Sequence, residues 1–89
     1  MKQGTTKDGF EFEVDTEALG TMEFIDDLAE LDDGNYLAIP RVLKKMFSPE
    51  EKKKLYDHLR DEKGHVQIAP TVAIITEILN LCGEEGKNS

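Results

Sequence analysis

The stretch PTVAIITEILNLC, residues 70–82, decides the fold of this chain of 89 residues. Its large aliphatic side chains cover about 180° of a helical wheel, whereas a surface helix of a small domain needs a stripe of roughly 100°. The clearly polar members are Thr76, Glu77 and Asn80. The pattern therefore predicts a helix from Pro70 to Cys82 that either lies at the centre of the fold or associates with another apolar surface.

Three residues carry the surplus apolar surface of this helix. Ile74, Ile78 and Leu81 lie beyond the arc that a core alone needs. We take them as a candidate face for a partner helix or a second copy of the chain, with burial at the centre of the fold as the alternative. Gly83 is expected to end the helix, and residues 84–89 to form a flexible polar tail.

The N-terminal segment, residues 3–14, predicts a β-hairpin. Apolar and acidic side chains alternate from Phe10 to Val14, which is the period of a strand with one buried face. Lys7-Asp8-Gly9 supplies the turn, because glycine accepts a positive φ without strain. A two-stranded hairpin is marginal by itself, so Phe10 and Phe12 should pack against helices.

Further helices are expected between the hairpin and residue 70. Their ranges are residues 15–19 for a short turn, and 21–31 and 37–47 for two amphipathic helices. Ser48-Pro49-Glu50-Glu51 is a capping box with proline at the first helical position, so another helix begins there and ends before Gly64. The expected fold class is mainly α (α+β): a small N-terminal β-hairpin followed by about four helices, in a single domain over residues 1–83.

The composition excludes several classes of function. The formal net charge is −8 and the isoelectric point is about 4.6, which disfavours binding to nucleic-acid phosphates and to anionic membrane surfaces. No apolar run is long enough to cross a bilayer, and the N-terminus does not resemble a signal peptide. A single cysteine cannot form an internal disulfide, which indicates a cytoplasmic protein.

Charge is unevenly distributed along the chain. Residues 1–35 hold 11 acidic and 2 basic residues, whereas residues 36–63 hold 8 basic and 5 acidic ones. This dipolar pattern suits head-to-tail self-association or an oppositely charged partner. Solvated helix faces are the more common cause of such a pattern.

No catalytic residues, metal ligands or cofactor site are expected. Cys82 lies on an apolar helix face with no histidine or aspartate nearby in sequence. His58 and His65 would need two further ligands to bind zinc. Asp26 and Asp27 fall on the solvated face of their helix, where nothing raises a carboxyl pKa. The sequence therefore favours a non-enzymatic protein that binds a partner.

Several segments together resemble a known protein family. They are KDGFEFEVD (7–15), MEFIDDLAEL (22–31), DDGN (32–35), LAIPRVL (37–43), LYDHLRDEKGHV (55–66) and GKNS (86–89). With these segments, nearly the whole chain resembles the small tail assembly chaperones of siphophages, as encoded in prophages of Gram-positive bacteria.

The resemblance implies a mostly helical fold and a function in the cytoplasm of the infected cell. Such chaperones bind the long apolar tape-measure protein, keep it soluble, help to recruit tail-tube subunits and are absent from the mature virion. No catalytic or binding residues of the family transfer to this sequence. The alternative function is that of a small acidic regulator, antitoxin-like or DNA-mimicking, that blocks a basic partner.

Overall fold

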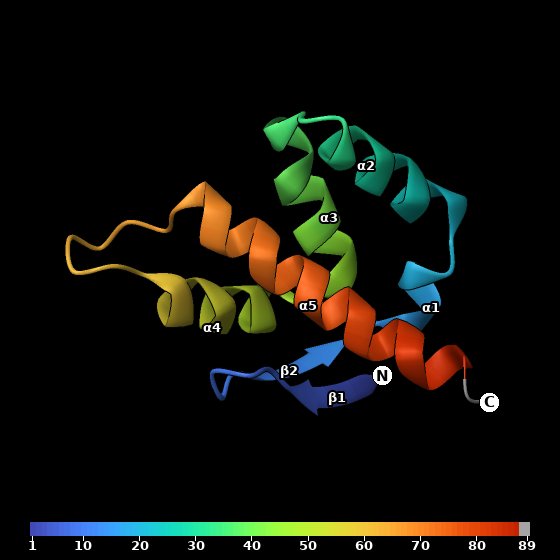
Figure 1. Ribbon diagram of the computed structural model, residues 1–89, viewed down its shortest axis with the longest axis horizontal. Coiled ribbons are helices and arrows are strands. Elements are labelled where there is room, and N and C mark those ends of the chain that lie inside the picture. The colour runs from blue at the N-terminus through green and yellow to red at the C-terminus, as the bar shows by residue number, and fades with distance from the viewer. Residues whose placement is uncertain (88–89) are drawn as a thin grey trace.

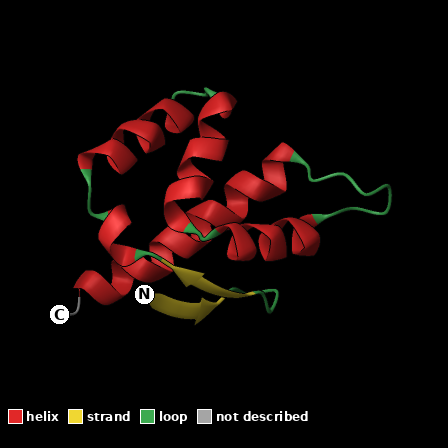
Figure 2. Cartoon of the chain, turned by 180° about the vertical axis from the view of Figure 1, so that it is seen from behind, coloured by secondary structure: helices red, strands yellow, loops and turns green. Residues whose placement is uncertain are grey.

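The computed structural model describes the backbone of residues 1–87 and the side chains of residues 1–82. It confirms a mainly helical fold with an N-terminal β-hairpin (Figure 1). The elements in chain order are β1 (Lys2–Thr5), β2 (Glu11–Val14), α1 (Thr16–Leu19), α2 (Met22–Asp32), the 3₁₀-helix η1 (Tyr36–Ala38), α3 (Ile39–Met46), α4 (Pro49–Leu59) and α5 (Ile68–Lys87). The two strands lie together at one edge of the helical body, as Figure 2 shows from behind.

The hairpin is antiparallel, and a glycine on β1 leaves room for an aromatic ring of β2. Gly4 of β1 is paired with Phe12 of β2, and the Phe12 ring lies against it. A Cβ atom added at Gly4 would lie 2.6 Å from Cζ of Phe12, so only glycine leaves room for the ring. Gly9, with a φ of +91°, makes the turn. Phe12 and Val14 are thereby buried against the helices, as the alternating pattern predicted.

Helix α5 is the central helix of the fold. It crosses the molecule from the end of α4, past α3, towards α1 (Figure 1). Ile74, Ile75 and Ile78 are buried in the same apolar cluster as Phe24 of α2 and Leu43 of α3. The sequence left two interpretations of the wide apolar face of this helix, association with a partner or burial at the centre of the fold. Ile74 and Ile78 are buried at the centre.

The bounds of α5 differ from the prediction at both ends. The helix begins at Ile68 rather than Pro70, because a proline in the first turn lacks an N–H group that would have no partner there. It continues through Gly83 to Lys87, because glycine weakens a helix by about 1 kcal/mol without ending it. The predicted tail over residues 84–89 therefore begins inside α5, and Asn88 and Ser89 lie outside the described residues. None of the helices in the described part of the chain has the length and hydropathy to cross a bilayer.

Asp27 corrects the prediction of a solvated carboxylate. Asp27 is only 7% exposed. Its carboxylate accepts a hydrogen bond from Nε of Arg41 at 3.0 Å and another from Nζ of Lys45. Arg41 also pairs with Glu30. The prediction was wrong because Asp27 lies one turn before Leu31, beside the core-facing residues of α2 rather than opposite them. That side is covered by basic side chains of α3, which local periodicity does not indicate.

We expect Asp27→Asn to lower the free energy of unfolding at neutral pH. The hydrogen bonds of Lys45 and Arg41 hold the pKa of the Asp27 carboxyl below its usual value. A depressed native pKa contributes stability above the unfolded pKa of about 3.9 and loses it as the pH falls through the native pKa. Urea titrations from neutral to acid pH should therefore show the two proteins converging below about pH 4. A difference that stays constant in acid would contradict this role. Glu30→Gln, at the exposed end of the cluster, is the control and should change stability much less.

We also expect Ser48→Ala to destabilise the protein by about 1 kcal/mol. The Ser48 hydroxyl caps α4 by accepting from the backbone N–H of Glu51 at 3.3 Å, as the capping box predicted. In a domain of this size the melting temperature should fall by roughly 4–8 °C, measured by circular dichroism. Ser48→Asp, which keeps a capping acceptor, is the control, and an equal loss in both variants would show that the cap is not the cause.

Candidate binding groove

Apolar side chains are exposed at several places on the surface of the described residues. The large ones are Met1, Met22, Ile25, Tyr36, Leu37, Ile68 and Leu81. Single exposed apolar residues are ordinary on a soluble protein. The informative cases are those in which exposed and half-buried apolar side chains gather around one hollow.

One apolar hollow lies between α1, α2 and the C-terminal part of α5. We call it the α2–α5 groove, with a volume of about 390 Å³, and it is lined by Thr16, Leu19, Gly20, Phe24, Ile25, Leu28, Leu79 and Cys82. Phe24 is fully buried and belongs to the core, whereas Ile25 is 46% exposed. Leu28 and Leu79, one from each wall, are half-buried against the core. The groove therefore runs from the core to solvent through apolar side chains.

The sequence of α2 explains why this face stays open. Thr21 caps the helix by accepting from the N–H of Phe24, so its register is set from the first turn. Phe24 and Leu31 point into the core, and Asp27 binds α3. Ile25 and Leu28 belong to the third side of the helix, which α1 and α5 cover only in part.

A second, smaller apolar hollow lies at the other end of α5. It has a volume of about 240 Å³ and is lined by Tyr36, Ile39, Pro40, Tyr56, Val66, Ile68 and Thr71. A lysine lies beside it, since Nζ of Lys52 lies 5.4 Å from the centre of the Tyr56 ring. This hollow is smaller than the α2–α5 groove, and no residue of α2 lies in its wall.

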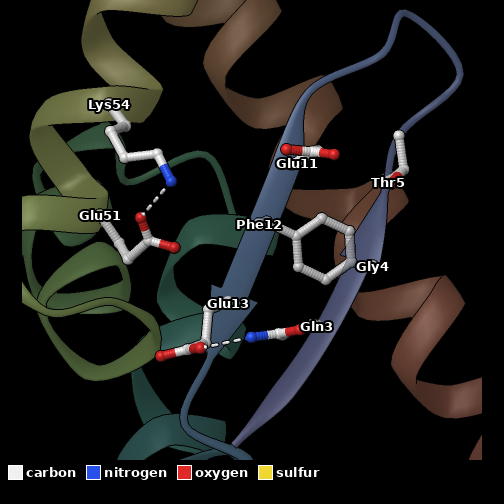
Figure 3. Close-up of a pocket in the computed structure, with 8 residues that line it drawn as sticks. All are labelled: Gln3, Gly4, Thr5, Glu11, Phe12, Glu13, Glu51 and Lys54. Atoms are coloured by element: carbon white, nitrogen blue, oxygen red, sulfur yellow. Dashed lines mark hydrogen bonds and ion pairs between the residues drawn. The ribbon is translucent and has the colours of Figure 1, made fainter.

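The hollow beside the hairpin is polar. Figure 3 shows the Phe12 ring over Gly4, with Glu13 and Gln3 joined at one end and Glu51 and Lys54 joined on α4. Nε2 of Gln3 donates to Glu13 at 2.9 Å, and Nζ of Lys54 lies 2.8 Å from Glu51. The hydrogen bond with Glu51 raises the pKa of Lys54, so this pair stays charged. Among the described side chains, no group of three histidine, cysteine or acidic residues could hold a metal ion.

The structure does not bring the predicted association face together at the surface. Ile74 is 5% exposed and Ile78 is fully buried, so the prediction was wrong for both. Leu81 is 37% exposed and lines a mixed hollow between α5 and the hairpin, with Thr6 and Glu77 in its wall. The core faces the middle of the apolar arc, at Ile75 and Ile78, and the edge at Val72 and Leu79 is only partly buried, because hairpin and helices pack on α5 from several sides.

The surroundings of Cys82, His58 and His65 are structural ones. Cys82 is half-buried, and burial raises the pKa of its thiol while nearby Lys2 acts against that shift. Nε2 of His58 lies 2.9 Å from Oδ2 of Asp8, and its ring lies 4.9 Å from that of Phe10. The backbone N–H of His65 donates to Asp61. These contacts hold the hairpin turn to α4 and order the loop after it.

Comparisons with protein-family models, with curated proteins and with solved structures found no match to this chain. The functional assignment therefore depends on the α2–α5 groove and its surroundings, together with the resemblance described above.

Proposed function

We propose that the protein is a non-enzymatic tail assembly chaperone of a siphophage. In this proposal it binds the tape-measure protein, keeps it soluble and helps to recruit tail-tube subunits. It acts in the cytoplasm of the host cell and is absent from the mature virion. The observation that carries the proposal is the α2–α5 groove, an open apolar surface on a strongly acidic protein.

The groove suits a protein that holds an apolar helix. Apolar grooves of this kind accept one face of an amphipathic helix through side chains at helical spacing. Burial of each large aliphatic side chain contributes about 1.5–3 kcal/mol, so a few contacts along the walls suffice for reversible binding. The net charge of −8 keeps the protein and its cargo apart from other copies in solution.

The electrostatics of the described residues favour binding over catalysis. Asp8, Asp27 and Asp61 are the carboxyl groups whose pKa is clearly shifted, and each shift is downward because hydrogen bonds stabilise the charged form. A general acid at neutral pH needs the opposite shift. These carboxylates stabilise turns and helix pairs instead.

The acidic surface supports a second candidate function. Residues 15–40 hold eight acidic residues and no basic one. A surface of that composition suits a small acidic regulator that blocks a basic partner. Such a protein would bind through its charges and would not depend on the apolar walls of the groove.

Co-expression with the phage tape-measure protein tests the proposal. We expect Ile25→Gln to reduce the soluble tape-measure protein recovered with the chaperone by at least about fivefold, because a polar group would enter the apolar wall at a cost of roughly 1–3 kcal/mol. Ile68→Gln is the matched control, since Ile68 is similarly exposed at 51% and lies in the other hollow. Both substitutions are at exposed sites, so thermal melting should show a folded protein.

Two results would overturn the proposal. Tape-measure protein that remains equally soluble with and without this protein would exclude the chaperone function. Equal loss of binding in the Ile25 and Ile68 variants would exclude the groove as its site. A basic partner captured equally by wild type and Ile25→Gln would instead support the acidic regulator.

A further inference from the structure

We propose that the α2–α5 groove selects amphipathic helices whose apolar face is flanked by lysine or arginine. The inference rests on the proposed function, since it names the chemistry of the segment that the chaperone would hold. It is carried by the charges around the groove, which are of one sign.

The walls contributed by α1 and α2 are bordered by carboxylates alone. Glu17 follows Thr16 of the groove wall, and Asp26 follows Ile25. Asp32 lies one helical turn after Leu28, on the same side of α2. All three are exposed, and none of them has an ion-pair partner among the described residues.

The basic residues of α3 do not neutralise this rim. Arg41 and Lys45 pair with Asp27 and Glu30, which lie on the side of α2 that faces α3. The other wall of the groove adds no positive charge either, because Glu77 is the single charged residue from Ile68 to Cys82. Lys2 lies near Cys82 at one end of the groove and has an interaction of its own.

The acidic residues at the end of α2 are not explained by the stability of the helix. Asp32 is the last residue of α2 and Asp33 is its C-cap, and the last turn contains no basic residue. A negative charge at a helix C-terminus opposes the helix dipole, so these carboxylates weaken α2. Asp32 lies on the side of α2 that carries Leu28 and Ile25 of the groove wall, and a positively charged partner there would account for its charge.

A cationic amphipathic helix satisfies both features of the site. Its apolar face would occupy the groove, and its flanking ammonium or guanidinium groups would reach the carboxylates of the rim. Apolar contact supplies affinity without direction, whereas charge complementarity fixes orientation and rejects acidic segments. A helix with acidic flanks would place like charges together and would be excluded.

Two synthetic peptides test the inference on the intact protein. Each has about 20 residues, or about 30 Å of helix, with leucine at the same helical positions. One carries lysine and the other glutamate at the flanking positions. In about 0.1 M salt we expect the lysine peptide to bind at least about tenfold more tightly, and the preference to shrink in about 1 M salt, where the Debye length falls from about 10 Å to about 3 Å.

Charge variants locate the effect. Asp26→Asn combined with Asp32→Asn should weaken binding of the lysine peptide roughly three- to tenfold at low salt, because the variant removes two of the exposed carboxylates that border the α2 wall. The same variant should melt no lower than wild type, because loss of the Asp32 charge relieves the helix dipole. The matched control is Glu11→Gln combined with Glu62→Gln, which removes two exposed carboxylates outside the groove and should leave binding unchanged.

The outcomes separate this inference from the proposed function. If both peptides bind equally and Ile25→Gln weakens both, the apolar groove is confirmed as a helix site and the charge selection is wrong. If neither peptide binds and the protein still keeps tape-measure protein soluble, the inference fails and the function stands. A dimer that Ile25→Gln converts to a monomer would make a second copy of the chain the occupant, and would also overturn the inference.

Discussion

The carboxylate of Asp27 is the interaction on which the arrangement of the helices depends. It is buried, and it binds Arg41 and Lys45 from two successive turns of α3. A buried charge is tolerated only when it is paired and hydrogen-bonded, so α2 can pack on α3 in one rotation about its axis. In that rotation Phe24 and Leu31 enter the core, and Ile25 turns away from it. The position of the groove thus follows from one ion-pair cluster on the opposite side of the helix.

A chain of this size has few other ways to expose an apolar surface without losing its fold. A small domain buries a limited share of its surface, and its stability margin is narrow. Here the central position of α5 supplies most of the core, with Ile74, Ile75 and Ile78 contacting the surrounding elements. Since α5 supplies most of the core, Leu28 and Leu79 do not have to be fully buried for the protein to fold. Both are half-buried and can contact a partner at the surface.

Local patterns predicted most of the elements and little of their packing. Alternation located the hairpin, and the capping box located the start of α4 at Pro49, because both signals depend on neighbouring residues only. The wide apolar arcs on α2 and α5 were visible in the sequence, but which part of each arc faces the core depends on neighbours distant in sequence. Ile78 was therefore expected at the surface and is buried, while Ile25 is exposed. A signal for the groove was present in α2, whose apolar residues cover more of the wheel than one core face needs.

The contact between the hairpin and α5 has a consequence for the order of folding. The backbone N–H of Lys7 donates to Glu77 at 2.7 Å across 70 residues of chain, whereas Arg41 and Asp27 are 14 residues apart. Closing a long loop costs more entropy than closing a short one, and distant contacts slow folding. We therefore expect α2 and α3 to associate early and α5 to dock late. The groove acquires its second wall only in that last step, so a nascent or partly folded chain has no binding site, and recognition is confined to the native state.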